Sequence, residues 1–104
     1  MTASMGVELS EPGTHERVGL LEAAADPVRW AVLDVLSQGS RCVCELQELV
    51  PVAGNLMSYH LKVLRESGLV TTTRRGRWVD YAVRADTFDR LVAALPGGGS
   101  RDGP

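Results

Sequence analysis

The sequence predicts a mainly α-helical domain with one two-stranded β-hairpin, and three observations support this fold class. Apolar residues recur at helical spacing in several segments between residues 17 and 95. Residues 69–83 are instead rich in Thr, Val, Trp and Tyr around a central Arg75 and Gly76, which is typical of a hairpin. Two helical segments are joined by only a few residues. Together these features predict a winged helix-turn-helix, with the hairpin as its wing.

Two helices are expected before the helix-turn-helix. Thr14 is the expected N-cap of a short helix over residues 17–25. Asp26 followed by Pro27 predicts a second helix over residues 27–36, because Asp caps free amides and Pro fits the first helical turn. The buried face of this second helix is expected to be either Trp30, Leu33 and Leu36, or Val32 and Val35.

The helix-turn-helix itself is predicted from the next two segments. A third helix is expected over residues 40–50, a tight connector over 51–54 and a fourth helix over 55–67. Three residues of the fourth helix fall at positions i, i+4 and i+7, which predicts its buried face. They are Met57, Leu61 and Leu64.

A fifth helix is expected over residues 86–95, and its apolar stripe is too wide for one small domain to cover. Burial against a second copy of the chain would stabilise so small a core, which favours a homodimer. The folded domain is expected to span residues 14–95, between a loose leader at 1–13 and a disordered tail at 96–104. The leader lacks the pattern of a secretory signal, and no segment approaches the roughly 20 apolar residues of a membrane span. These features predict a cytoplasmic protein without a membrane partner.

The charge of the chain is unevenly distributed. The net charge is −2, but residues 40–84 carry seven Lys and Arg against four Asp and Glu, whereas residues 1–39 carry two against six. The basic charge therefore coincides with the helix-turn-helix and the hairpin, which is compatible with a nucleic-acid partner despite the negative total.

Four stretches of the chain resemble the ArsR/SmtB family of metal-sensing transcriptional repressors, in the family's order and spacing. They are ADPVRWAVLDVL (25–36), RCVCELQELV (41–50), MSYHLKVLRESGLV (57–70) and RRGRWVDY (74–81). The resemblance implies a dimer that holds double-stranded operator DNA when metal-free and releases it when a toxic metal or metalloid binds. It also implies a dimer interface made by the first and last helices.

The expected DNA-reading surface consists of the fourth helix and the wing. A helix fits the major groove with its first turns near the base edges, and arginines at a wing tip can reach phosphates or a narrow minor groove. The candidates on the helix are Asn55, Leu56, Ser58, Tyr59, His60 and Lys62, and those on the wing are Arg74, Arg75 and Arg77.

Cys42 and Cys44, the only cysteines, match the family's Cys-Val-Cys motif. In a reducing cytoplasm, and at a spacing that would strain a disulfide, they are expected to be free, metal-bound or redox-active. Residues two apart in a helix point in nearly opposite directions, so both sulfurs can reach one ion only if the helix begins after Cys42 or is distorted. The helix start and Arg41 are expected to lower the thiol pKa values.

Two thiols do not complete a site for any soft ion. The expected inducers are As(III) or Sb(III), then Cd(II) or Pb(II), then Zn(II) or Ni(II). Family arsenic sensors carry a third cysteine three residues after the second, where this chain has Gln47. Further ligands would come from solvent, a small thiol or the N-terminal arm, which offers Glu8, Glu11, His15 and Glu16.

Other function classes are less compatible with the sequence. No catalytic constellation, glycine-rich phosphate loop or HExxH motif is present, so the protein is not expected to be an enzyme. The alternatives that stay open are redox sensing by the same thiols, thiols without a function, transcriptional activation, and a winged helix that binds protein.

Overall fold

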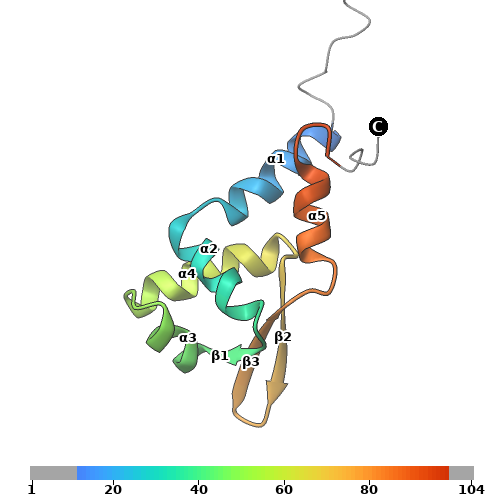
Figure 1. Cartoon of the computed structure of the whole chain (residues 1–104). Helices are drawn as coiled ribbons and strands as arrows, with labels where there is room; N and C mark the ends of the chain where they lie inside the picture. Colours follow the sequence, from blue (N-terminus) through green and yellow to red (C-terminus); the bar gives the residue numbers. More distant parts are fainter. Residues whose placement is uncertain (1–11, 99–104) are drawn as a thin grey trace, which may run out of the picture.

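The computed structural model describes residues 12–98, which form five helices and a small antiparallel sheet (Figure 1). The order is α1 (Pro12–Ala24), α2 (Pro27–Leu36), β1 (Arg41–Cys42), α3 (Val43–Leu49), α4 (Gly54–Glu66), β2 (Val70–Arg75), β3 (Trp78–Val83) and α5 (Thr87–Ala94). The predicted winged helix-turn-helix is confirmed. None of the helices within residues 12–98 is long and apolar enough to cross a membrane.

The expected leader (1–13) and tail (96–104) fall mostly on residues 1–11 and 99–104, which lie outside the described residues. The first helix begins at Pro12, inside the expected leader, so Thr14 lies within the helix and the prediction that it caps the helix is wrong. Pro fits the first turn of a helix, which explains this earlier start. At the other end the chain turns after α5, where the Gly98 N–H donates to the Leu95 carbonyl at 2.6 Å.

Helix α2 begins where the Asp-Pro pair predicted. Asp26 is extended, with φ −133° and ψ 137°, and its Oδ1 accepts from the N–H groups of Val28 at 2.8 Å and Arg29 at 3.1 Å. The buried face of α2 combines the two expected sets, because Val32, Leu33 and Leu36 are buried and Val35 is half-buried. Trp30 is 59% exposed, so its expected burial is wrong for the single chain.

The sheet has three strands in the order β1-β3-β2. Strands β2 and β3 form the expected hairpin, and Gly76 supplies a φ of +63° in its turn. Strand β1 was not expected: Arg41 pairs with Tyr81 and Cys42 with Asp80. This pairing holds residues 41 and 42 extended, so the third helix begins at Val43 rather than at residue 40.

The core is formed by buried residues of α1, α2, α3 and α4 together with the base of the hairpin. Met57, Leu61 and Leu64 are at most 2% exposed, which confirms the predicted inner face of α4. Burying an aliphatic side chain of this size stabilises a fold by roughly 1.5–3 kcal/mol. The inner face therefore fixes which side of α4 remains in solvent.

Candidate DNA interface and thiol site

The thiols of Cys42 and Cys44 lie together at the junction of β1 and α3. Cys42 is the last residue of β1 and the N-cap of α3, with φ −80° and ψ 168°, and Cys44 stands in the first helical turn. Their Sγ atoms are 2.9 Å apart. The helix thus begins after Cys42, which is the geometry that lets both sulfurs face one ion. Cys42 is buried and Cys44 is exposed, so solvent reaches the pair from one side.

The environment of Cys44 raises the pKa of its thiol. The largest cause is the hydrogen bond with Cys42, followed by desolvation and by the charge of Cys42. The N–H groups of Cys44 and Glu45 lower the pKa by less. The expected lowering is therefore wrong for Cys44, because the neighbouring thiol outweighs the helix start. An ion that binds this sulfur must displace a proton, so its affinity would rise with pH.

Among the described residues of one chain, no third ligand joins the thiols. Residues 12–98 contain no group of three or more His, Cys, Asp or Glu arranged to hold a metal ion. Glu45 accepts a hydrogen bond from the Cys42 N–H at 3.0 Å, which stabilises the start of α3. Gln47 donates from Nε2 to the Val52 carbonyl at 3.1 Å and so fastens α3 to the connector before α4. The donor set of the described chain is thus two sulfurs, which fits a thiophilic ion that takes further ligands from elsewhere.

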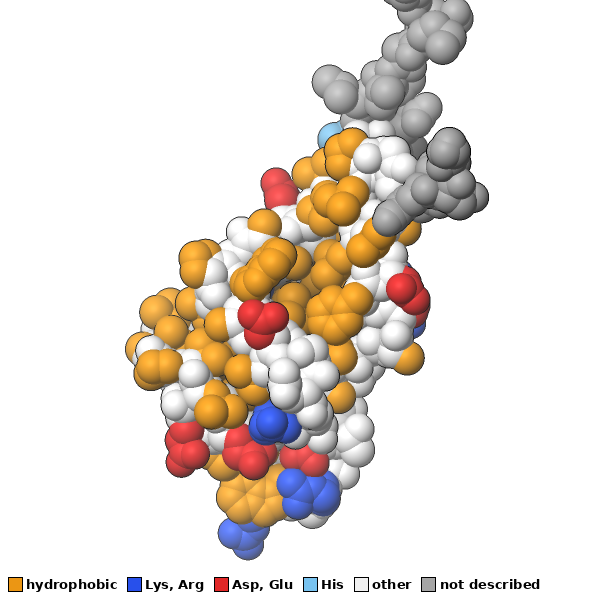
Figure 2. Space-filling view, in the orientation of Figure 1, with side chains coloured by type: hydrophobic (Ala, Val, Ile, Leu, Met, Phe, Trp, Pro, Cys, Tyr) orange, Lys and Arg blue, Asp and Glu red, His pale blue; other side chains and the backbone are white. Residues whose placement is uncertain are grey.

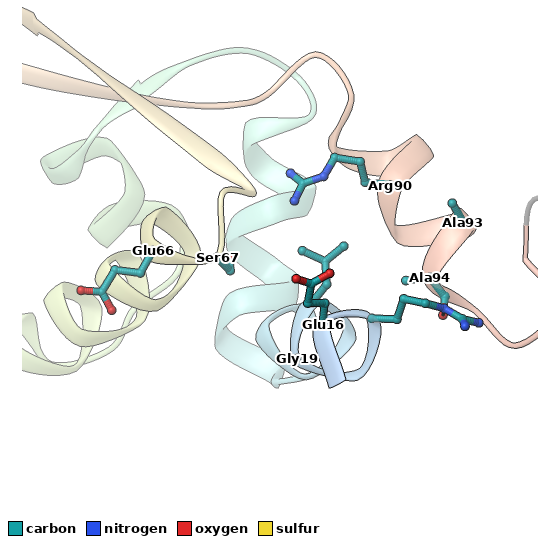
Figure 3. Close-up of a pocket in the computed structure, with 9 residues that line it drawn as sticks. Glu16, Gly19, Glu66, Ser67, Arg90, Ala93 and Ala94 are labelled. Atoms are coloured by element: carbon teal, nitrogen blue, oxygen red, sulfur yellow. Dashed lines mark hydrogen bonds between the residues drawn. The ribbon is translucent and has the colours of Figure 1, made fainter. Parts of the chain in front are cut away.

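His15 and Glu16 lie near the start of α1, which Figure 1 shows at the opposite end of the molecule from β1. Glu16 borders a cavity of about 690 Å³ between α1, α4 and α5, where Arg90 also projects (Figure 3). Within one chain neither residue approaches the thiols, so they could serve the site only from a second subunit. Glu8 and Glu11 lie outside the described residues.

Most of the expected contact residues on α4 share one exposed face. Leu56 and Tyr59 are 48% and 56% exposed, and the other exposed candidates on this helix are Asn55, Ser58 and Lys62. The helix begins at Gly54, so Asn55, Leu56 and Ser58 occupy its first turns, the part that enters a major groove first.

His60 is separated from that face, because it is only 9% exposed. Arg29 Nη1 donates to His60 Nδ1 at 2.8 Å, which leaves the proton of the neutral ring on Nε2. Arg29 Nε also donates to the Ala23 carbonyl at 2.6 Å. His60 therefore connects α4 through α2 to the end of α1, and the structure does not bring it together with the exposed candidates.

The wing tip carries the three expected arginines, all of them exposed: Arg74, Arg75 and Arg77. Arg75 differs from the others because it forms two hydrogen bonds with Asp80, from Nε to Oδ2 at 2.8 Å and from Nη2 to Oδ1 at 3.0 Å. These bonds, together with the charge of Arg75, lower the pKa of Asp80. Asp80 is not among the residues predicted from the sequence, although the hairpin register around Gly76 could have indicated it.

An apolar groove of about 440 Å³ lies between α1, α2 and α5. Figure 2 shows the hydrophobic side chains that gather over these helices. Phe88, Val92 and Leu95 line the groove and are 44–46% exposed, and Trp30 lines it as well. The expectation that a single chain leaves the stripe of α5 uncovered agrees with this exposure.

Comparison with known proteins identifies the family. The model of the bacterial regulatory protein, arsR family, matches residues 26–72. The chain is 47% identical over 73 residues to the HTH-type transcriptional repressor SmtB of Mycobacterium tuberculosis, a match that covers 70% of this chain and 54% of that protein. The arsenical resistance operon repressor of Bacillus subtilis is 34% identical over 73 residues, with 69% and 70% covered.

Solved structures agree with the sequence comparisons. The transcriptional repressor BigR from Xylella fastidiosa has a TM-score of 0.67 and 33% identity, and the match covers 78% of this chain and 83% of that chain. A possible transcriptional regulator for arsenical resistance has a TM-score of 0.65 and 34% identity, with 70% and 76% covered. The chain belongs to the ArsR family, whose members are DNA-binding transcriptional regulators rather than enzymes.

Proposed function

We propose that this protein is a cytoplasmic repressor that binds operator DNA and releases it when a thiophilic metal or metalloid ion binds Cys42 and Cys44. The observation that carries the proposal is the 2.9 Å separation of the two Sγ atoms at the start of α3. Support for DNA binding comes from the exposed face of α4 and the arginine-rich wing tip.

Two surfaces contribute to the proposed DNA recognition, the exposed face of α4 and the wing tip. The exposed face of α4 enters the major groove, where Asn55 can bond to an adenine edge and Leu56 can contact a thymine methyl group. Ser58, Tyr59 and Lys62 reach bases or phosphates from the same face. The wing arginines then neutralise phosphates beside the groove, which adds affinity for any sequence.

A homodimer through α1 and α5 provides the second recognition helix. The apolar groove along these helices would be covered by the same groove of a second copy, as a two-fold interface requires. Two copies of α4 would then read a palindromic operator. The separation of the two recognition helices sets the affinity for DNA.

The thiol site is placed to alter that separation. As(III) and Sb(III) best match soft sulfur ligands, followed by Cd(II) and Pb(II) and then by Zn(II) or Ni(II) with oxygen or nitrogen ligands. Cys42 and Cys44 would hold the ion, and a further ligand would come from solvent, a small thiol, or His15 and Glu16 of a second subunit. Because Cys42 caps α3 and Gln47 fastens α3 to the connector before α4, a shift of the thiols moves the helix-turn-helix.

The test is fluorescence anisotropy on DNA from the protein's own promoter, with metal-free, reduced protein. We expect one thiophilic ion to weaken DNA binding by about 5- to 150-fold, the usual range of allosteric coupling. The Cys42→Ser/Cys44→Ser variant should bind metal-free DNA equally well and should not respond to the ion. Tight DNA binding that no ion changes would remove the sensing proposal and leave the DNA proposal standing.

Redox sensing by the same thiols is the second candidate, because the exposed Cys44 lies beside Cys42. An oxidant such as peroxide would then replace the ion as the releasing agent. The same anisotropy assay separates the two, since release by peroxide that dithiothreitol reverses, without any response to ions, would identify a redox regulator.

A further inference from the structure

The wing tip contains an acidic residue in a region that is otherwise basic. Asp80 holds the guanidinium of Arg75 through Nε and Nη2, at 2.8 Å and 3.0 Å. The Arg75 side chain is still 64% exposed, whereas that of Asp80 is 20% exposed. The arginine therefore remains accessible while its orientation is fixed.

Asp80 is well placed to fix another side chain because its own backbone is held from both sides. It lies on β3, the central strand, opposite Thr73 of β2 and opposite Cys42 of β1. A residue paired on both sides has little freedom to move. The backbone of Asp80 is thus held in place, and one of its two strand partners is Cys42.

The pairing leaves part of the Arg75 guanidinium free to bind. An arginine has five N–H donors, and the bidentate pair uses one on Nε and one on Nη2. The two donors of Nη1 and one of Nη2 remain for a phosphate. An arginine that is already ordered loses less side-chain entropy when it binds DNA.

We propose that Asp80 is a positioning residue for DNA binding, and that it holds Arg75 in the orientation that contacts a phosphate. This inference rests on the proposed DNA-binding function. Two effects of Asp80 oppose each other, because its charge repels phosphates while its hydrogen bonds order the arginine. We expect the ordering effect to prevail, because the Asp80 carboxylate is already paired with the guanidinium that lies between it and the phosphate.

Because the two effects of Asp80 act in opposite directions, the direction of the change in DNA affinity shows which one dominates. Asp80→Asn removes a negative charge close to the DNA, so charge alone would tighten binding, whereas loss of the bidentate pair should weaken it. We expect metal-free full-length Asp80→Asn to bind promoter DNA about 3- to 10-fold more weakly than the wild type. Arg75→Lys keeps the charge but cannot form the same fork, so it should show a similar loss.

A double-mutant cycle separates positioning from general damage to the wing. Arg75→Ala should weaken binding and reduce the slope of log affinity against log salt by about one. In that background Asp80→Asn should cause no further loss. The matched control is Asp86→Asn, which makes the same charge change at an exposed pair, Arg84 Nε with Asp86 Oδ1 at 3.3 Å, and should bind DNA at least as tightly as the wild type.

Each result decides between the alternatives. Unchanged or tighter binding by Asp80→Asn, or wild-type binding by Arg75→Lys, would overturn the positioning role while leaving the repressor intact. An equal loss from Asp80→Asn with and without Arg75 would also overturn it, since Asp80 would then act through the hairpin fold. Failure of the wild type to bind promoter DNA would instead reject the proposed function, and this inference with it.

Discussion

At the scale of single residues, Cys42 combines three structural positions. It ends β1, it is the N-cap of α3, and it contributes one of the two sulfurs that lie 2.9 Å apart. A change at this one residue therefore acts on a strand and on a helix together. Cys44 occupies only the helix, so its sulfur can move without disturbing the strand pairing.

Gln47 is the residue at which the ion preference should be easiest to change. It lies one helical turn after Cys44, on the same side of α3, so a cysteine there would direct a third sulfur toward the pair. We expect Gln47→Cys to raise the affinity for As(III) at least 10-fold, because three thiolates complete the coordination of this ion. The measurement is a titration of the reduced protein followed by thiolate-to-arsenic absorption.

The control for this variant is Gln47→Ala. It removes the hydrogen bond to the Val52 carbonyl, as Gln47→Cys does, but it adds no sulfur. The alanine variant should keep the wild-type affinity for As(III). An increase in As(III) affinity in both variants would show that loosening the connector, rather than a third thiolate, is responsible.

At the scale of elements, the cap of α2 is a source of stability that depends on pH. The pKa of Asp26 is lowered, chiefly by the hydrogen bond from the Arg29 N–H, while desolvation opposes this shift. The hydrogen bond from the Val28 N–H and the charges of His60 and Arg29 lower the pKa further. A carboxyl whose pKa is lower in the folded state stabilises that state above the unfolded pKa of about 3.8. This contribution is lost as the pH falls through the folded pKa.

Asp26→Ala should therefore reduce the free energy of unfolding by about 1 kcal/mol at pH 7, the usual effect of losing an N-cap. The difference from the wild type should shrink once the pH falls below 3.8. Asp26→Asn also caps helices well, so it should lose less stability at pH 7, and its own stability should lack the acid-dependent loss that the titration of Asp26 causes in the wild type. Urea unfolding at a fixed protein concentration across this pH range measures all three proteins. A difference that stays constant with pH would contradict the titration of Asp26.

The elements that the sequence could predict are those with local signals. The Asp-Pro pair located the start of α2, the i, i+4, i+7 spacing located the inner face of α4, and Gly76 located the turn of the wing. Strand β1 was missed because it has two residues and exists only through its pairing with β3, which is distant in the sequence. A local pattern cannot reveal such a pairing.

The same reason explains the errors at the site. The motif predicted both thiols, but the raised pKa of Cys44 depends on how closely the two sulfurs approach each other, and that depends on β1. His60 was grouped with the DNA-reading face because of its place in the motif. Its side chain is instead buried and accepts a hydrogen bond from Arg29 on another helix, a contact that the pattern of α4 alone cannot reveal.

At the scale of the whole molecule, the apolar groove and the wing lie at opposite ends and have different proposed functions. Figure 1 shows α1 and α5 at one end and the β2–β3 hairpin at the other, with the helix-turn-helix between them. Dimerisation through α1 and α5 would therefore leave both wings and both recognition helices outside the interface. The proposed ion site lies between these regions, where β1 meets α3.

The groove predicts the effect of a charge at Phe88, which is 45% exposed in the single chain. A carboxylate buried in an apolar interface has no partner to compensate its desolvation, so Phe88→Asp should weaken dimerisation at least 100-fold. Sedimentation velocity at micromolar concentration should find a dimer for the wild type and a monomer for the variant. DNA affinity should fall as well, because the two recognition helices are then no longer linked.

The control is Leu49→Asp, which introduces the same charge on α3, at a residue that is 56% exposed and does not line the groove. This variant should remain a dimer. Trp30 gives a second readout, because it lines the groove and the only other tryptophan is Trp78 on the wing. In a Trp78→Phe background, the emission of Trp30 should shift to longer wavelength when Phe88→Asp separates the subunits. A dimer that persists with Phe88→Asp and dissociates with Leu49→Asp would place the interface on the helix-turn-helix instead.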